Sequence, residues 1–449
     1  MIKLNVIPDV QKFIFNSILL GPNNNENKKN PLYLHYILIP LILFATTGIA
    51  KEYQFTHTVE DYINYALAHN PALHSADHMI EMTKEQRKVS TAIPDPSISL
   101  EYMDKMISEK GVTVAKVSIS QKIPWFRKLS AKRTVVEKTV MKLDHTKSNI
   151  KIQLVYNVRE AYVSLYAVGQ KIFYMKRSLD LLKQMESVML SAYAAAVGSQ
   201  SALLKLQVKM ALAENKILSL EEEGRIIRYI LEELLNTKAA LQFPYPEELP
   251  KLKVVTDISE IKNSALMNNT NVLIQKGSVE EAKANVTAAA QIYSPDFSVS
   301  ASYTSPKFTG TKFVNFGELG EWSAMLSLSL PVWHKNNRAK VNEAKQHLAS
   351  EEEKLVKEEL SAVRGGMVHH VKLEDMERQI KLFQNVLIPK AKQTVILLQE
   401  KYTIQKGSVL DFLDAEKILM DLEMELVDME KKRELYAAEI IIRSIGRYK

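Results

Sequence analysis

Two similar helix–turn–helix segments stand in this chain and limit the folds open to it. The second, NVLIPKAKQTVILLQEKYTIQKGSVLDFLDAEKILM (residues 385–420), has helical periodicity, a predicted kink at Pro389 and a turn at Gly407. The first, ESVMLSAYAAAVGSQSALLKLQVKM (residues 186–210), has Gly198 and Ser199 where the second has Gly407 and Ser408. Two such tips in one chain predict an internal duplication.

The rest of the sequence recurs in the same order. Each half is predicted to contain a short helix, a helix of about twenty residues, a strand pair, a very long helix, a tip and a return helix. At 1.5 Å per residue, a helix of about seventy residues reaches roughly 100 Å. The predicted organisation is an N-terminal extension with a signal peptide at 1–50, a first repeat at 51–242, a Pro-rich linker at 243–257 and a second repeat at 258–449. The predicted strands lie at about 97–123 and 297–330, and the tips lie near 198 and 407.

The predicted strands alternate apolar and polar residues, which is typical of a half-buried sheet. SISLEYM places Ile98, Leu100 and Tyr102 on one face, and FSVSASY and WSAMLSLSLPVW follow the same period of two. Aromatic residues at the strand ends are compatible with the interfacial girdles of a bilayer. Surface hairpins on a water-exposed domain are the alternative interpretation.

Composition favours long helices and excludes cysteine chemistry. The 449 residues include only 14 Gly and 15 Pro, and 46% are hydrophobic. The absence of cysteine excludes disulfides, thiolate metal sites and cysteine nucleophiles. The net charge of +7 is spread over mixed Lys and Glu, which predicts solvated helix faces and no nucleic-acid partner.

The N-terminus has the pattern of a secretory signal. Lys28 and Lys29 precede the apolar run PLYLHYILIPLILFATTGIA (residues 31–50). This run ends in small residues and contains His35 and Pro40, so we expect export with cleavage near Ala50 rather than a permanent spanning helix. An uncleaved anchor is the alternative. Because no other apolar run could span a bilayer as a helix, any further insertion is expected to use strands.

Four strands per chain are too few to close a membrane barrel, which needs at least about eight. Three copies related by cyclic symmetry would supply twelve strands. The expected fold class is therefore mainly α with a small β part. Duplicated antiparallel coiled-coil hairpins would form a helical tunnel, and four strands per chain would contribute to a twelve-stranded trimeric transmembrane β-barrel.

The sequence resembles the TolC-like outer-membrane efflux proteins over about residues 58–446. The resemblance rests on ALAHNPAL, IPDPSISLEY, SQKIPWFRKLSAKR and LIPKAKQTVILLQEKYTIQKGSVLDFLDAE. It implies a homotrimer in outer-membrane lipid that passively exports solutes and docks onto a periplasmic adaptor and an inner-membrane pump. The PDPS and IPW segments also resemble the heavy-metal and cation-efflux branch of the family.

The resemblance assigns roles to residues at the second tip. Asp411 and Asp414 match the aspartates that constrict the periplasmic entrance, where threefold symmetry would gather six carboxylates that attract cations. The alternative is that both favour the positive end of the helix that follows Ser408. The first tip has Ala202 and Lys205 at these positions.

The family also implies that the tips contact the adaptor and that nearby side chains hold the entrance closed. The adaptor contacts are expected at Gly198, Ser199, Gly407 and Ser408. Tyr402 and Lys406 are expected to tether neighbouring helices.

Other functions find little support in the sequence. His74, His78 and Glu81 share a helix face, but such pairs are usually incidental, so no metal site and no cofactor is predicted. The sequence contains no P-loop, G-x-S-x-G or Rossmann motif, so no enzymatic activity is predicted. The second class considered is a periplasmic coiled-coil adaptor or scaffold. Metals, drugs and polypeptides remain open as cargo.

Overall fold

The computed structural model divides into two units, Met1–Gln54 and Phe55–Lys449. It describes residues 57–105, 112–195, 198–237, 243–254, 257–305, 320–404 and 406–444. The predicted signal sequence lies outside these residues. Everything below concerns the second unit.

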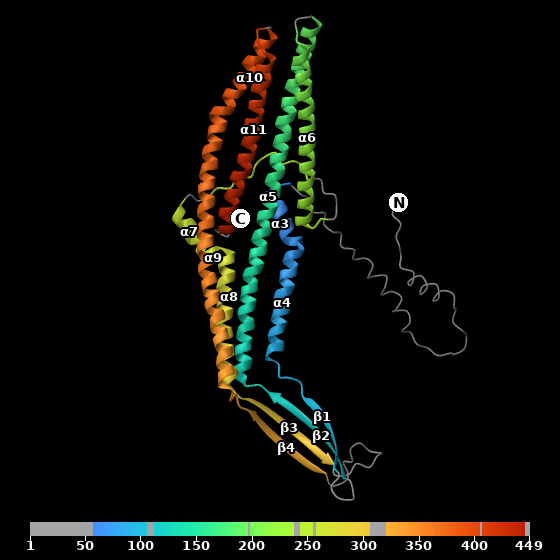
Figure 1. Ribbon diagram of the computed structural model, residues 1–449, viewed down its shortest axis with the longest axis vertical. Helices are drawn as coiled ribbons and strands as arrows, with labels where there is room; N and C mark the ends of the chain where they lie inside the picture. Colours follow the sequence, from blue (N-terminus) through green and yellow to red (C-terminus); the bar gives the residue numbers. More distant parts are fainter. Residues whose placement is uncertain are drawn as a thin grey trace, which may run out of the picture. The chain divides into compact units, whose positions relative to one another are not determined.

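The described chain is mostly helical and carries one small sheet (Figure 1). The element order of residues 59–235 recurs in residues 258–444, with three additions: a 3-10 helix after α8, a π-helix between α9 and α10, and a π-helix after α11. The first series is α3 (Val59–His69), α4 (Pro71–Thr91), β1 (Ser97–Lys105), β2 (Val112–Ile123), α5 (Phe126–Ala194) and α6 (Gln200–Leu235). The second is α7 (Ile258–Asn268), α8 (Thr270–Ala290), η1 (Gln291–Tyr293), β3 (Asp296–Ser305), β4 (Glu321–Ser329), α9 (His334–Leu382), η2 (Phe383–Leu387), α10 (Ile388–Thr403), α11 (Val409–Ala438) and η3 (Glu439–Ser444).

The short helices begin where the sequence supplies a side-chain acceptor. Thr58 accepts the backbone N–H of Asp61 at 3.3 Å, as expected for an N-cap. Asn70 and Asn269 cap α4 and α8 by accepting the N–H two residues later, at 2.9 and 3.0 Å. These two asparagines hold equivalent positions in the two series, so the same local chemistry starts both helices.

Two long helical hairpins extend to one end of the unit, and the sheet lies at the opposite end (Figure 1). The first hairpin is α5 and α6, and α5 continues for 69 residues without interruption. The second hairpin is α9, α10 and α11. Its outgoing arm contains the π-helix η2 directly before Pro389, at the kink that the sequence predicts. Because Pro389 has no N–H to donate, the helical hydrogen-bond ladder must rearrange there.

The sheet is antiparallel in the order β1-β2-β3-β4, and one of its faces is mainly apolar whereas the other is mainly polar. The register aligns Ile98, Ile119, Ala301 and Ala324 across all four strands, so the apolar residues share one face. The adjacent row on the other face is Ser99, Ser118, Ser302 and Ser323. Hydroxyl pairs join Ser99 to Ser118 at 2.6 Å and Ser302 to Ser323 at 2.7 Å. The alternation predicted from the sequence is confirmed.

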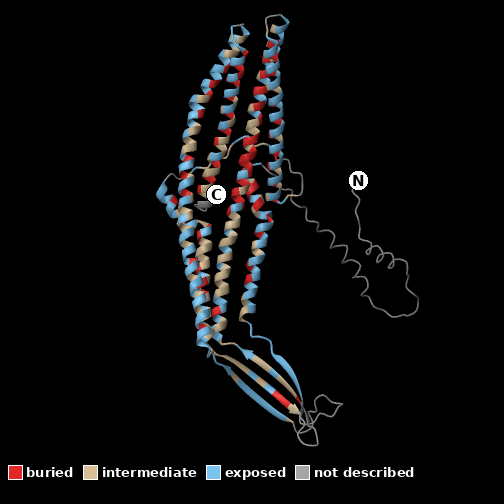
Figure 2. Ribbon diagram, viewed as in Figure 1, coloured by how far each residue is buried: buried red, intermediate tan, exposed pale blue. Residues whose placement is uncertain are grey.

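Most of the apolar face of this sheet is open to solvent in the single chain, although Ala115 and Tyr303 on the same face are buried. Leu100, Trp322 and Leu326 are each more than 60% exposed. In Figure 2 the helices carry most of the buried residues, whereas the strands are largely exposed. Within the described residues, most of this apolar face is therefore not covered by another element of the chain.

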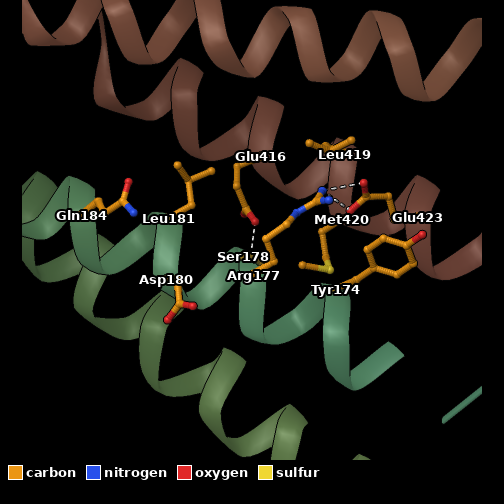
Figure 3. A pocket seen from close by; sticks show the side chains of 10 residues that line it. All are labelled: Tyr174, Arg177, Ser178, Asp180, Leu181, Gln184, Glu416, Leu419, Met420 and Glu423. Carbon is orange, nitrogen blue, oxygen red and sulfur yellow. Dashed lines mark hydrogen bonds and ion pairs between the residues drawn. The ribbon is translucent and has the colours of Figure 1, made fainter. Parts of the chain in front are cut away.

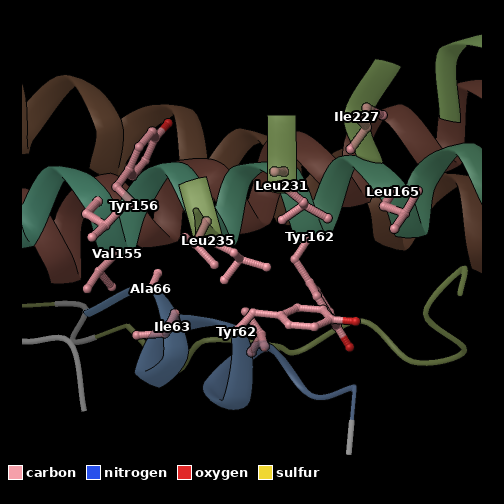
Figure 4. Close-up of a cluster of buried hydrophobic side chains, with 14 of the residues drawn as sticks. Tyr62, Ile63, Ala66, Val155, Tyr156, Tyr162, Leu165, Ile227, Leu231 and Leu235 are labelled. Carbon is pink, nitrogen blue, oxygen red and sulfur yellow. The ribbon is translucent and has the colours of Figure 1, made fainter. Parts of the chain in front are cut away.

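The largest buried cluster joins the base of the first hairpin to α3 (Figure 4). The ring of Tyr62 packs against Tyr162 and Phe243, with centroids 5.8 and 5.5 Å apart. Leu165, Leu231 and other side chains from α5 and α6 complete the cluster. This core fixes the lower part of the first hairpin, whereas the upper part packs against the second hairpin in another buried cluster that includes Met185, Leu206 and Phe412.

The Pro-rich linker is held between α5 and α6 by Tyr245. A Cβ on Gly169 would lie 2.8 Å from the Cβ of Tyr245, and one on Gly224 would lie 2.5 Å from its hydroxyl. The guanidinium of Arg228 stacks over the Tyr245 ring at 4.5 Å. The two glycines thus provide the space in which the linker crosses the hairpin.

Among the described helices, none combines the length and the apolar character that a membrane crossing requires.

Candidate functional site: the tips and the seam between the hairpins

The two tips share one backbone geometry. Ser199 precedes α6 with φ −90° and ψ 121°, and Ser408 precedes α11 with φ −90° and ψ 129°. A Cβ on Gly198 would lie 2.7 Å from the backbone N of Tyr193, and one on Gly407 would lie 2.9 Å from that of Tyr402. Both tips therefore need a glycine five residues after a tyrosine. The sequence carries this signal as Tyr-x₄-Gly-Ser in both segments.

Asp411 and Asp414 are exposed on the first turns of α11. The backbone N–H of Asp411 donates to the Ser408 hydroxyl at 3.5 Å, so Asp411 lies in the first turn, where a helix favours negative charge. Asp414 instead lines a groove of about 600 Å³ between α6 and α11, together with Lys205 and Lys209 of α6. The structure thus brings basic residues of the first tip beside an acid of the second.

Tyr402 lies in the last turn of α10, and Lys406 lies in the tip between α10 and α11. Tyr402 is half-buried against the apolar cluster beneath the tips, and this burial raises the pKa of its phenol. Lys406 is exposed, and its backbone N–H donates to the Lys401 carbonyl at 2.9 Å, which closes the end of α10. Tethering between neighbouring helices by these two side chains stays a prediction.

A column of buried carboxyl groups runs along α11, and the sequence analysis missed it. Glu416 and Glu423 are buried and Glu430 is half-buried. The three residues are spaced by seven, so they share the helix face that points to the neighbouring helices. This heptad spacing of glutamates was the available signal, but charged residues at such positions are usually solvated.

The column lies against α5 around a cavity of about 420 Å³ (Figure 3). Arg177 donates to both carboxylate oxygens of Glu423 at 2.6 and 2.9 Å, and Lys392 of α10 lies 3.4 Å from the same group. Ser178 donates to Glu416 in a buried hydrogen bond. Farther down the seam, Lys171 of α5 donates to Asp428 at 2.6 Å. These contacts connect the first hairpin to the second.

Burial shifts the protonation of two members of this column. Desolvation raises the pKa of Glu416 above the ordinary value of a glutamate, against the lowering effects of the Ser178 hydrogen bond and of Lys209. Desolvation likewise raises the pKa of Glu430, against Lys251 and the Gln384 hydrogen bond at 2.9 Å. Both groups therefore retain protons more readily here than in water.

The histidines considered as metal ligands lie apart from the tips. His74 and His78 are exposed on α4, and Glu81 pairs with Lys84 at 2.7 Å. Throughout the part of the chain that the structure describes, no three His, Asp or Glu side chains are grouped so that they could hold a metal ion.

Comparison with known proteins agrees with this architecture. Residues 261–443 match the family model described as "Outer membrane efflux protein". No curated protein matches the chain by sequence.

Several solved structures are similar to the chain in fold. The outer-membrane channel OprN aligns with a TM-score of 0.75 and 14% identity, over 87% of this chain and 90% of that one. CusC aligns with a TM-score of 0.73 and 16% identity over 88% and 95% of the two chains. The CmeC outer membrane channel of Campylobacter jejuni aligns with a TM-score of 0.73 and 14% identity, over 95% of this chain and 94% of that one.

These similarities confirm the resemblance found in the sequence. At such identities the structures establish the fold, which extends over both series of elements, and the family model covers most of the second series. The second series of this chain therefore matches the outer membrane efflux protein family, and the chain has the fold of the solved outer-membrane channels.

Proposed function

We propose that this efflux protein works as a homotrimer that forms the exit duct of a tripartite efflux system. In this proposal three copies place their sheets edge to edge in a twelve-stranded barrel in outer-membrane lipid. The helical hairpins form a tunnel on the periplasmic side. The duct is passive and has no enzymatic role, and it docks onto a periplasmic adaptor and an inner-membrane pump.

The two-faced sheet is the observation that carries the proposal. Its apolar face is exposed in the single chain, and its opposite face carries rows of serine. A sheet of this kind fits between lipid and water when the apolar side faces lipid and the hydroxyls face an aqueous lumen. A water-exposed scaffold would leave a large apolar surface in solvent, so the channel is favoured over the coiled-coil scaffold.

The organisation along the chain follows from the same proposal. Residues 1–50 act as an extension and export signal, residues 51–242 and 258–449 are two TolC-like repeats, and residues 243–257 connect them. The recurring element order and the matching tip geometry support this division.

The functional residues of the duct lie at the tips. We assign Asp411 and Asp414 to the periplasmic aperture, where three copies would bring six carboxylates together. The turns at Gly198–Ser199 and Gly407–Ser408 are assigned to adaptor contact, since both lie at the ends of the hairpins that are farthest from the sheet (Figure 1). Metal cations and small organic toxins are the proposed cargo classes, and the partner pump selects between them.

The test is the oligomeric state and membrane partition of the mature chain from Lys51 onward. Detergent-solubilised trimers recovered from the outer-membrane fraction are the expected result. A monomer or dimer in the water-soluble periplasmic fraction would contradict the duct and support the scaffold.

A further inference from the structure

We propose that the junction between the sheet and the long helices binds the headgroups of anionic phospholipids, and that Arg127, Lys335 and Arg338 are the cations that bind them. This role rests on the proposed duct, because it requires the apolar face of the sheet to face lipid. It adds the class of lipid that the protein selects and the residues that select it.

Basic segments follow the return strands in both series. β2 and β4 lead into α5 and α9 at the end of the sheet nearest the helices (Figure 1). The first ten residues of α5 include four Lys or Arg and no acid, and the first nine residues of α9 include three Lys or Arg and no acid. Because the start of a helix ordinarily favours acidic residues, these cations need a reason other than helix stability.

In the first series, ring contacts connect the apolar face of the sheet to one of these cations. Ile123 and Phe297 are register partners on that face, and the ring of Trp125 lies 5.6 Å from that of Phe297. Trp125 also packs on Phe126 at 5.0 Å, and the guanidinium of Arg127 lies 6.0 Å from the Phe126 ring centroid. The apolar face therefore continues through two aromatic rings to an exposed cation.

The second series has the same order of side chains. Leu330, Val332 and Trp333 follow β4, and each is at least 60% exposed. Lys335 and Arg338 come next, and because they are three residues apart in α9 they share a helix face. Apolar and aromatic side chains followed by long cations are typical of the boundary between the hydrocarbon and the headgroups of a bilayer.

A polar contact fixes the geometry of the junction. Lys128 donates to Asp296 at 2.9 Å, and the same carboxylate accepts the backbone N–H of Trp125 at 3.3 Å. Asp296 begins β3, so this contact ties the second series to the start of α5 and holds Trp125 near Phe297. The aromatic part of the junction is therefore ordered before any lipid binds.

The three proposed cations remain available for a ligand. Within the part of the chain that the structure describes, Arg127, Lys335 and Arg338 are exposed and take part in no ion pair, whereas Lys128 and Arg133 do. A phosphatidylcholine headgroup carries its own cation beside the phosphate, but a phosphatidylglycerol headgroup has a net negative charge. Unpaired basic residues therefore favour phosphatidylglycerol.

Strand length places these cations at the level of the headgroups. The four strands have 9, 12, 10 and 9 residues, close to the 9–11 or so that cross the hydrocarbon core of a bilayer. At about 1.5 Å per residue, the three cations lie within roughly 6 Å of the starts of their helices. The headgroup layer on each side of a bilayer is roughly 5–8 Å thick, so it would contain them.

Native mass spectrometry of the detergent-solubilised full-length protein counts bound lipids, and dioleoylphosphatidylglycerol and dioleoylphosphatidylcholine are the two probes. We expect phosphatidylglycerol to bind at least about tenfold more tightly, since each basic residue near anionic headgroups contributes about fivefold. Raising ammonium acetate from about 0.1 M to about 1 M should reduce this preference, because salt screens exposed charges.

The variant Arg127→Gln with Lys335→Gln and Arg338→Gln is expected to bind both lipids equally. Arg127→Lys with Arg338→Lys keeps the charge and should keep the preference. The matched control removes the same charge from exposed positions on the outgoing arm of the second hairpin, and it should also keep the preference. This control is Lys381→Gln with Lys390→Gln and Lys401→Gln.

Equal affinity of the parent for the two lipids would overturn the proposal. It would also be overturned by a preference that survives in the glutamine variant of the junction or disappears in the control. If that glutamine variant does not fold, the parent decides, and a preference unchanged in about 1 M salt overturns the proposal. Outer-membrane trimers without a lipid preference would leave the duct standing and remove the lipid site. A monomer that still prefers phosphatidylglycerol would leave the lipid site standing and remove the duct.

Discussion

Lys205 of α6 and Asp414 of α11 occupy equivalent positions after the two tips, and both side chains line the same groove. Each residue follows its tip serine by six positions, so a duplicated backbone brings opposite charges together. The mouth of the duct would therefore be a balance of acids from one repeat and lysines from the other, rather than an isolated acidic ring.

The tip charges are predicted to set ion preference. Asp411→Ala combined with Asp414→Ala should raise conductance or lower cation preference in planar bilayers, because the mouth would lose both the constricting side chains and their negative charge. Lys205→Ala should raise cation preference by removing the opposing charge.

Reversal potentials in a salt gradient measure both effects. Glu222→Gln is the control, since Glu222 is exposed on α6 and pairs with Arg225 at 2.6 Å. If the double aspartate variant keeps the parent current and selectivity, these residues are not part of the aperture.

The tip glycine is predicted to be essential for adaptor binding. Gly407→Pro removes the backbone freedom of the turn, and even Gly407→Ala would bring a Cβ to within 2.9 Å of the Tyr402 backbone. We expect reduced recovery of the adaptor in pull-downs from envelope extracts, with trimers still formed. Gly365→Ala is the control, since a Cβ there meets nothing within 4 Å. Normal adaptor recovery with Gly407→Pro would argue against the tip assignment.

Arg177 is predicted to be important for stability. Arg177→Ala leaves the carboxylate of Glu423, whose side chain is 3% exposed, paired with Lys392 at 3.4 Å. Loss of one partner of a fully buried pair costs about 3–5 kcal/mol, and we expect a smaller loss here because the Arg177 side chain is 45% exposed and Lys392 still faces the carboxylate.

Thermal unfolding of the detergent-solubilised protein provides the measurement. The surface pair Arg225–Glu222 is the comparison, and Arg225→Ala should change stability by less than about 1 kcal/mol. Equal effects of Arg177→Ala and Arg225→Ala would show that the seam contact is no stronger than a surface ion pair.

Glu416 is predicted to make stability depend on pH with a definite sign. Its pKa is raised in the folded protein, so its favourable contribution is full below the ordinary glutamate pKa and is lost as pH rises through the folded value. Glu416→Gln should therefore match the parent at about pH 4 and unfold at a higher temperature than the parent at about pH 8. A parent that is the more stable of the two at alkaline pH would contradict this assignment.

Local chemistry was sufficient to predict most of the elements. Thr58, Asn70 and Asn269 start helices because their side chains accept backbone N–H groups, and such caps can be recognised without tertiary context. The alternation of apolar and polar residues along β1 is also a local signal, and it was enough to place Ile98 and Leu100 on one face of the sheet. Repetition of these local signals also revealed the recurring order of elements.

The seam was decided only by tertiary packing. Glu416, Glu423 and Glu430 have the sequence pattern of an ordinary charged helix, and nothing near them in the chain shows that α5 covers them. Arg177 is 246 residues from the carboxylate that it binds, so the pair exists only when the two hairpins meet. Lys205 likewise lies beside Asp414 only because α6 and α11 meet near the tips. Short-range hydrogen bonds and hydrophobic periodicity can be predicted from the sequence, whereas burial and charge pairing depend on which helices pack side by side.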